Sequence, residues 1–235
     1  MKRILFLITK SEVGGAQKWT KEQLDICQGR FLCHLATNRE GWLTVSSNYE
    51  SIFLNRLIEK RFSLKYLYLL SEYVRANKIE IVVCSSANAG IYGRLLKFTN
   101  PKLRVTYVSH GWSAIYAEKR LAWFYTFVEK ILSSVGDSVL CVSKHDFDTA
   151  VEVIRVRRQK LKHLSNSIIP LSEQTSLEGR DRNRILCVAR ASPPKRTDLL
   201  IEAVRDVDVE LHVIGSGECI SDLKAQAPSN VIFYG

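Results

Sequence analysis

The stretch CVARASPPKRTDLLIEAV, residues 187–204, passes from a strand to a helix within a few residues. Its first residues are apolar, and the run that follows Thr197 has the apolar spacing of an amphipathic helix. The turn between them holds Arg190, Lys195 and Arg196. A turn that only connects two elements favours Gly, Asn or Asp, and cations near a helix N-terminus oppose the helix dipole. The stretch therefore predicts either solvated cations or an anion bound among them.

The same alternation of strand and helix continues along the chain. Several of the apolar runs are continuous rather than alternating, which indicates strands that are covered on both faces. The expected strands are 3–9, 30–37, 79–86, 103–110, 137–143, 160–165, 184–190, 209–215 and 230–235. The expected helices are 15–28, 50–60, 63–77, 88–98, 117–133, 144–155, 197–205 and 218–226. This order predicts an α/β protein with doubly wound parallel sheets.

One polar segment, residues 167–183, interrupts this rhythm and has no apolar period. We expect a linker there. It would separate a Rossmann-like first domain, residues 1–166, with six strands from a partial Rossmann-like second domain, residues 184–235, with three. In a sheet of order 3-2-1-4-5-6 that lacks its last three strands, strand 184–190 would lie at an edge.

The composition limits the classes of partner. The chain has 235 residues and a formal net charge of +10, which favours nucleotides, phosphorylated lipids, anionic membranes or nucleic acid as partners. No nucleic-acid-binding motif accompanies the charge, so nucleic acid is not expected.

The six cysteines form no CxxC pair, and several lie in apolar runs, which indicates small buried side chains in a reducing cytoplasm. No apolar run approaches the ~18 residues of a membrane span.

Two candidate features follow strands of the first domain, at the carboxyl ends where open α/β sheets bind ligands. Gly14 and Gly15, in KSEVGGAQ, follow the first strand and would let the backbone approach a phosphate at the start of the next helix. His110, in SHGWS, ends strand 103–110. From the residues alone, a plain glycine turn and a structural histidine remain open as alternatives.

Two further features follow strands of the second domain. Arg190 offers a rigid, planar guanidinium with paired N–H donors, and Lys195 offers an ammonium on a flexible side chain. Together they could bind a diphosphate. Gly215 and Gly217, in VIGSGE, open the next turn between a strand and a helix. Solvated cations and an ordinary turn are the alternatives.

Three other patterns favour structural interpretations. Asp206 and Asp208 form a DxD pattern, but they precede a strand and would lie at the opposite end from the expected site. The basic run 155–163 is expected on a solvated connection, with a membrane or nucleic-acid role as the lesser alternative. The aromatics of 123–132 have helical spacing and indicate core, with a membrane-facing patch as the alternative.

Taken together, the motifs resemble those of glycosyltransferase family 4, the large retaining group with the GT-B fold. The resemblance covers nearly the whole chain in the family's order, and the Arg-x4-Lys stretch followed by DLLIEA is its most specific part. The matching pieces are GGAQ, SHGW, SNSI, VARASPPKRTDLLIEAV, VIGSGE and NVIFYG.

The resemblance implies an acceptor-side first domain that faces a donor-binding second domain, with an NDP-sugar between them. His110 would approach the donor sugar as a catalytic residue, while side chains, without a metal or another cofactor, would stabilise the leaving diphosphate. The residues implied to bind the diphosphate are Gly14, Gly15, Arg190, Lys195 and Gly217.

Two departures from the family matter. Arg196 stands where family members usually have glycine. Family members also continue past NVIFYG into a stretch with two glutamates eight residues apart, so we expect a chain truncated in its donor domain with weak or absent turnover.

The expected function is transfer of a sugar from an NDP-sugar to a glycan or lipid-linked acceptor in cell-surface polysaccharide biosynthesis. A non-catalytic remnant or binding module is the first alternative, and a sugar-nucleotide epimerase of the same fold is the second. The expected location is the cytoplasm, with peripheral contact with an anionic membrane at its inner face as a further option.

Overall fold

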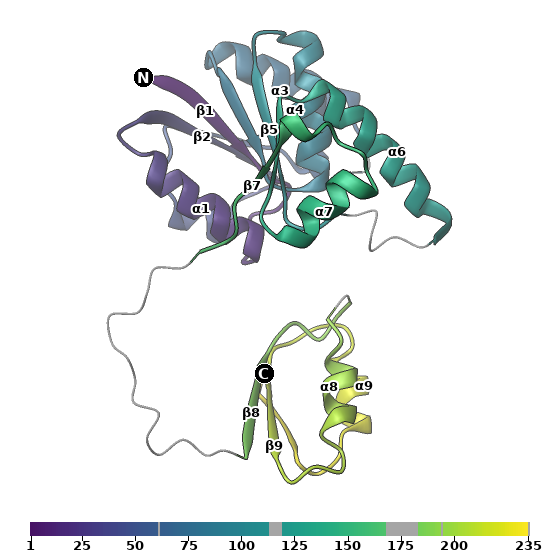
Figure 1. Ribbon diagram of the computed structural model, residues 1–235. Coiled ribbons are helices and arrows are strands. Elements are labelled where there is room, and N and C mark those ends of the chain that lie inside the picture. The colour runs from purple at the N-terminus through teal and green to yellow at the C-terminus, as the bar shows by residue number, and fades with distance from the viewer. Residues whose placement is uncertain (61, 113–118, 168–182, 194, 235) are drawn as a thin grey trace. The chain divides into compact units, whose positions relative to one another are not determined.

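The protein divides into two compact units, Met1–Ile168 and Ile169–Gly235, each with its own parallel sheet (Figure 1). The computed structural model describes residues 1–60, 62–112, 119–167, 183–193 and 195–234. Most of the expected linker, residues 168–182, lies outside the described residues.

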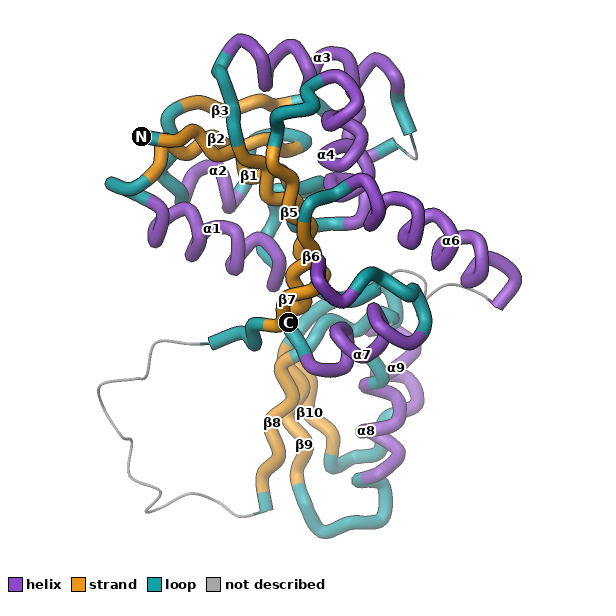
Figure 2. The backbone as a smooth tube through the Cα atoms, turned by 45° about the horizontal axis from the view of Figure 1, so that its top comes forward, coloured by secondary structure: helices purple, strands orange, loops and turns teal. Residues whose placement is uncertain are grey.

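The larger unit carries a parallel sheet of order β3-β2-β1-β4-β5-β6-β7 (Figure 2). Its strands are β1 (Lys2–Leu7), β2 (Phe31–Thr37), β3 (Ser51–Leu54), β4 (Ile81–Cys84), β5 (Arg104–Ser109), β6 (Ser138–Cys141) and β7 (Leu161–His163). Its α-helices are α1 (Gly15–Cys27), α2 (Trp42–Ser46), α3 (Leu64–Ala76), α4 (Ala87–Thr99), α6 (Lys119–Val135) and α7 (Lys144–Glu152). The predicted α/β class with parallel sheets is confirmed.

The helix expected over residues 50–60 is wrong. The segment forms the edge strand β3, which pairs with β2, and then a 3-10 turn, Arg56–Glu59. The side chain of Asn55 starts this turn by accepting a hydrogen bond from the Leu57 amide at 3.0 Å. A short apolar run has no decisive period, so strand and helix could not be told apart there. The larger sheet consequently has seven strands in place of the six expected.

The central strand β1 is buried on both faces, which explains its continuous apolar run. Leu5 and Leu7 belong to a core cluster formed with side chains of α3, α4 and α7. Ile4 and Phe6 belong to the opposite cluster, formed with side chains of α1 and α2. Strand β1 pairs with β2 on one side and β4 on the other, so the strand order reverses at β1.

A buried ion pair joins α6 to α4. Arg94 Nη1 lies 2.9 Å from Glu129 Oε2, and their side chains are only 1% and 10% exposed. The Arg94 guanidinium also donates to the Gly90 carbonyl and lies over the Tyr107 ring, 4.4 Å from its centroid. Because both charges are buried, this pair fixes which face of α6 is turned inward.

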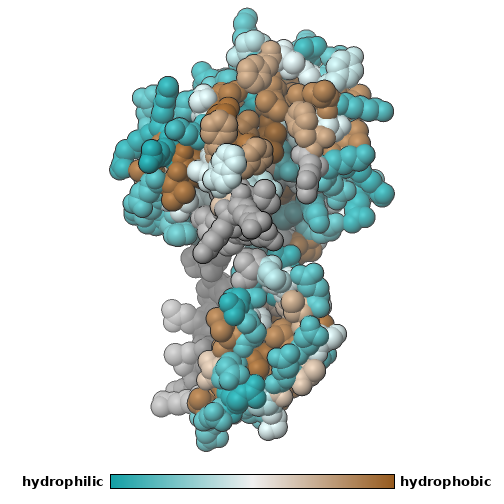
Figure 3. Space-filling model, turned by 90° about the vertical axis from the view of Figure 1, so that its right-hand side faces the viewer, coloured by the Kyte–Doolittle hydropathy of each residue, from teal (hydrophilic) through white to brown (hydrophobic). Residues whose placement is uncertain are grey.

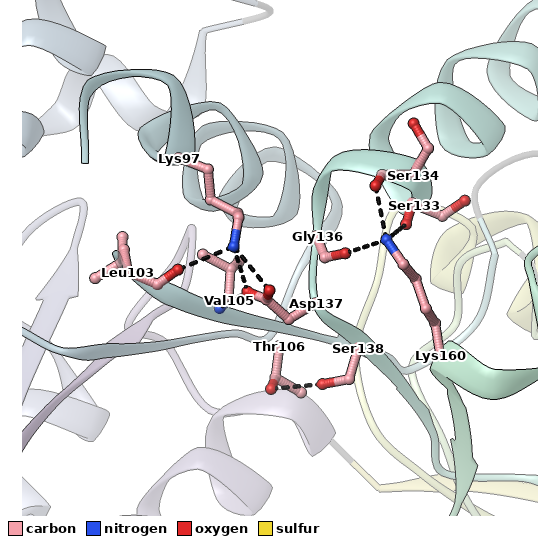
Figure 4. A network of polar contacts seen from close by, with 10 residues as sticks. All are labelled: Lys97, Leu103, Val105, Thr106, Ser133, Ser134, Gly136, Asp137, Ser138 and Lys160. Carbon is pink, nitrogen blue, oxygen red and sulfur yellow. Dashed lines mark hydrogen bonds and ion pairs between the residues drawn. The ribbon is translucent and has the colours of Figure 1, made fainter. Parts of the chain in front are cut away.

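A lysine holds the C-terminal end of α6. Lys160 Nζ donates to the carbonyls of Ser133, Ser134 and Gly136, at 3.2, 2.6 and 2.6 Å (Figure 4). Ser133 and Ser134 belong to the last turn and Gly136 directly follows it, where helix carbonyls lack partners of their own. The contact brings the 3-10 turn Arg158–Lys160 against the end of α6.

The smaller unit has a parallel sheet of order β10-β9-β8, so β8 is an edge strand, as expected. Ile201 and Val204 pack on Leu211 and Val213 to form its core on one face of this sheet. Its elements are β8 (Arg184–Val188), α8 (Thr197–Ala203), β9 (Glu210–Ile214), α9 (Ile220–Gln226) and β10 (Val231–Tyr234). Exposed apolar residues of its strands are Leu186, Val188, Ile214, Ile232 and Tyr234.

Glu129→Ala should lower the free energy of unfolding by about 3–5 kcal/mol, because it leaves the Arg94 charge buried without its partner. The matched control is Glu72→Ala, which removes the carboxylate of an exposed pair with Arg75 and should cost less than about 1 kcal/mol. Urea unfolding of the three proteins measures both changes. Equal losses in the two variants would show that the Arg94–Glu129 pair does not hold α6.

Candidate functional site

The strand order places the larger unit's candidate site at the carboxyl ends of β1, β4 and β5. In open α/β sheets the crevice lies where the strand order reverses, which here is between β1 and β4. The ends of these two strands are tied together, because Thr9 Oγ1 lies 2.6 Å from Ser86 Oγ and the Thr9 amide also donates to Ser86 Oγ at 3.1 Å.

The glycine pair stands at the start of α1. A Cβ atom on Gly14 would lie 2.5 Å from Gln17 Oε1, and Gln17 Nε2 donates to the Lys10 carbonyl at 3.0 Å. The absence of a side chain at Gly14 therefore leaves room for the Gln17 side chain, whose hydrogen bond to Lys10 closes the loop after β1. A Cβ atom on Gly15 would have no neighbour within 4 Å, so the backbone at Gly15 borders open space.

His110 directly follows β5 and precedes Gly111, whose φ of 116° is in the region that favours glycine. The rings of His110 and Trp19, the latter from α1, form a T-shaped pair with centroids 5.5 Å apart. Burial lowers the pKa of His110, and the nearby Asp146 carboxylate opposes this shift. The imidazole is therefore held toward its neutral form.

Four buried polar atoms at these strand ends have no hydrogen-bond partner among the described residues. They are Ser11 Oγ, Ser85 Oγ, Ser109 Oγ and His110 Nε2. Buried polar groups are normally satisfied, so each of these atoms is one that a polar ligand or water could reach. Ser11 lies beside the start of α2, because a Cβ atom on Gly41 would lie 2.5 Å from Ser11 Oγ. Sequence reasoning did not single out Ser11 or Ser85. The polar pair Ser85-Ser86 directly after the apolar IVVC run is the signal that could have found one of them.

The residues after His110 are anchored to α7. Trp112 is buried, and its Nε1 donates to the Asp146 carbonyl at 2.9 Å. Ser143 caps α7 by accepting from the Asp146 amide at 3.1 Å, and its hydroxyl donates to the Asp146 carboxylate. These contacts hold His110 and Gly111 between β5 and a packed indole. Ser113, the last residue of the SHGWS motif, lies outside the described residues.

In the smaller unit, the loops after β8 and β9 lie against each other. The Ala191 amide donates to the Ser216 carbonyl at 3.0 Å, and the Cys219 amide donates to the Ala191 carbonyl at 2.9 Å. A Cβ atom on Gly217 would lie 2.4 Å from the Ala191 carbonyl oxygen. Gly217 is therefore required by this loop contact, whatever else it does.

The three cations of the turn differ in their surroundings. Arg196 pairs with Asp198 in the first turn of α8, with Nη2 2.6 Å from Oδ2 and Nε 2.9 Å from Oδ1. Arg190 and Lys195 are exposed, and within the described part of the chain neither forms an ion pair. The local charge of Arg196 is thus compensated, while Arg190 and Lys195 remain available to an anion.

The DxD residues Asp206 and Asp208 precede β9, at the amino edge of the smaller sheet, as the sequence indicates. Among the residues that the structure describes, no group of three His, Cys, Asp or Glu side chains is placed to bind a metal ion.

The predicted site residues thus fall into two groups, one in each unit. In the larger unit, α1 begins at Gly15 and carries the Trp19 ring that contacts His110. In the smaller unit, Arg190 and Gly217 lie on the two joined loops, and Lys195 follows on the first of them.

The sequence has close relatives among curated proteins, although no protein-family model matches it. The O-antigen biosynthesis glycosyltransferase WbnH of Escherichia coli is 36% identical over 240 residues, which cover 100% of this chain and 70% of that protein. A probable O-antigen biosynthesis glycosyltransferase of the same species, WbiN, matches to the same extent.

Solved structures share the fold at lower identity. The lipopolysaccharide outer core galactosyltransferase WaaB in its apo form is 17% identical, with a TM-score of 0.67 over 99% of this chain and 68% of that one. Anabaena HepE in complex with UDP-glucose is 14% identical, with a TM-score of 0.75 over 100% of this chain and 69% of that one. Both the sequence relatives and the shared fold agree with the motifs, and the chain belongs to the glycosyltransferases of GT-B fold.

Proposed function

We propose that the protein acts as a retaining, family 4-type glycosyltransferase in cell-surface polysaccharide assembly. It would transfer a sugar from a nucleotide-sugar to a glycan or lipid-linked acceptor, with peripheral contact with an anionic membrane. The 36% identity to WbnH, a protein named for O-antigen biosynthesis, supports the acceptor class. The complexes of HepE with UDP and with UDP-glucose support a nucleotide-sugar donor.

The observation that carries the proposal is the pair of uncompensated cations after β8. Arg190 and Lys195 stand on a loop at the carboxyl edge of a parallel sheet, where such folds bind ligands, while the neighbouring Arg196 is paired with Asp198. When the bond between sugar and diphosphate breaks, negative charge develops on the leaving oxygen. A guanidinium and an ammonium stabilise that charge through charge-assisted hydrogen bonds.

The proposal gives the larger unit a complementary role. Gly14 and Gly15 would border the donor diphosphate, Gly217 would do so in the smaller unit, and His110 would contact the donor sugar as the catalytic residue. A neutral imidazole can donate a hydrogen bond to a sugar hydroxyl or accept one from it, without adding a charge to the site. The unpaired hydroxyls of Ser85 and Ser109, at the ends of the neighbouring strands β4 and β5, would offer further polar contacts.

A binding module without turnover is a second candidate, and it shares all these residues. The enzyme and the binding module would use the same residues, and they differ in whether bound sugar is transferred. Nucleotide binding together with sugar transfer supports the enzyme, whereas binding without transfer to any glycan or lipid-linked acceptor supports the module.

Arg190→Ala and Lys195→Ala should each weaken nucleoside-diphosphate binding by about 1.5–3 kcal/mol, because each removes a charge-assisted hydrogen bond. Calorimetric titration with UDP and GDP measures the change. Arg205→Ala is the control, because it removes an equal charge between α8 and β9, at the opposite edge of the sheet. Equal affinities in all four proteins, or an equal loss in the control, would contradict the diphosphate site.

His110→Ala should reduce sugar transfer from a nucleotide-sugar while the melting temperature stays within a few degrees of the wild-type value. The reason is that its unpaired Nε2 contributes no described hydrogen bond to the fold. Radiolabelled sugar incorporation and thermal scanning measure the two effects. If stability falls by several kcal/mol, the histidine is structural.

His110 should also make stability depend on pH. Because burial lowers the pKa of His110 in the folded protein, the unfolded chain binds more protons below the ordinary histidine pKa of about 6.5. The free energy of unfolding should therefore fall as pH drops from about 6.5 toward 5, and the fall should be smaller in His110→Ala. His163→Ala, at an exposed histidine, serves as control, and an identical slope in all three proteins would contradict a His110 that burial holds neutral.

A further inference from the structure

The outer face of α6 carries a row of exposed apolar side chains. Trp123, Phe127 and Ile131 follow one another at four-residue spacing and are 68%, 55% and 47% exposed, with Phe124 beside them at 47%. The expectation that these aromatics pack in the core is therefore wrong. Figure 3 views the side on which α6 projects in Figure 1, and it shows hydrophobic residues gathered on this face of the larger unit.

This row cannot turn inward by rotation of the helix. Glu129 and Leu132 occupy the opposite face of α6 and are buried, and Glu129 is bound to Arg94. The last turn is held by Lys160, which donates to the Ser133 and Ser134 carbonyls. Exposure of the aromatic row is thus a fixed feature of the fold, and a surface of this kind usually marks an interaction site.

A group of cations lies at the C-terminal end of the same helix. The contact of Lys160 with the last turn of α6 brings residues 155–162 to that end. In the part of the chain that the structure describes, none of the exposed cations of this segment forms an ion pair. They are Arg155, Arg157, Arg158 and Lys162.

We propose that the aromatic row of α6 and this cationic group form one docking surface for an anionic lipid membrane. Amphipathic helices that lie in the membrane interface combine Trp and Phe on one side with Lys and Arg, and phosphate head groups attract the cations. None of the described helices is long and apolar enough to span a bilayer, so α6 would lie along the surface rather than across it.

Lipid is favoured over a second protein molecule by charge. Two copies of this chain would each bring a net charge of +10, and each copy would carry the same four cations at the C-terminal end of α6. Like charges in the same surface oppose self-association, whereas an anionic head-group layer neutralises them. The inference extends the proposed function, since it names the surface that would bring the protein to a lipid-linked acceptor.

The experiment is vesicle flotation of the full chain, without donor or acceptor. Phosphatidylcholine vesicles are compared with vesicles that contain about one third phosphatidylglycerol. The wild type should float with the anionic vesicles and remain mostly unbound with the neutral ones. Because no turnover is measured, failure here leaves the transferase proposal standing, and failure of nucleotide binding leaves this one standing.

The aromatic row is tested with the double variant Trp123→Ser/Phe127→Ser, which should lower the partition onto anionic vesicles at least about tenfold, because the buried apolar area is lost. The matched control is Leu64→Ser/Tyr68→Ser, which removes two side chains of comparable exposure, 73% and 64%, from α3. This control should float like the wild type, and circular dichroism should show that both variants are folded.

The cationic group is tested with Arg157→Gln and Lys162→Gln, each of which should weaken binding to anionic vesicles by about fivefold at low salt. Trp123→Phe should retain binding but lose the blue shift of fluorescence that vesicles cause in the wild type. Equal flotation of the wild type and the α6 double variant would overturn the proposal. Wild-type flotation that is the same with neutral and anionic vesicles would also overturn it. A third contradicting result is a wild-type dimer that binds no vesicles and that the double variant does not form.

Discussion

The burial of β1 on both faces is the constraint on which the larger unit depends. Leu5 and Leu7 require helices on one face, and Ile4 and Phe6 require them on the other, so the chain must cross the sheet on both sides of β1. This requirement places the reversal of strand order between β1 and β4, where Thr9 Oγ1 meets Ser86 Oγ. The candidate site is therefore a consequence of how the central strand is covered.

The sequence was sufficient to place residues at the carboxyl ends of strands. Continuous apolar runs identified most of the strands, and the carboxyl ends of those runs identified His110, Gly15 and Arg190 as candidates. Such inferences succeed because side-chain direction and strand polarity are local properties, and a parallel sheet brings all its carboxyl ends to one edge.

The sequence was insufficient where a residue's surroundings come from distant segments. Helical spacing of aromatics could not tell whether α6 turns them inward, because that depends on Arg94, 35 residues away from Glu129. The charge of Arg196 could not be discounted until its pairing with Asp198 was visible. The helix predicted over residues 50–60 was wrong for another reason. Pairing with β2, rather than the segment's own sequence pattern, makes β3 a strand.

The contact between the loops after β8 and β9 has an entropic consequence. Backbone hydrogen bonds hold residues on both sides of Arg190, from Ala189 to Ile214 and from Ala191 to Ser216, so the loop is already ordered without any ligand. An anion that reaches Arg190 then restricts only a side chain, at a cost of about 0.5–1.5 kcal/mol, and not a length of backbone. The proposed diphosphate binding at this loop would therefore be strengthened by preorganisation, and the close approach at Gly217 is part of what provides it.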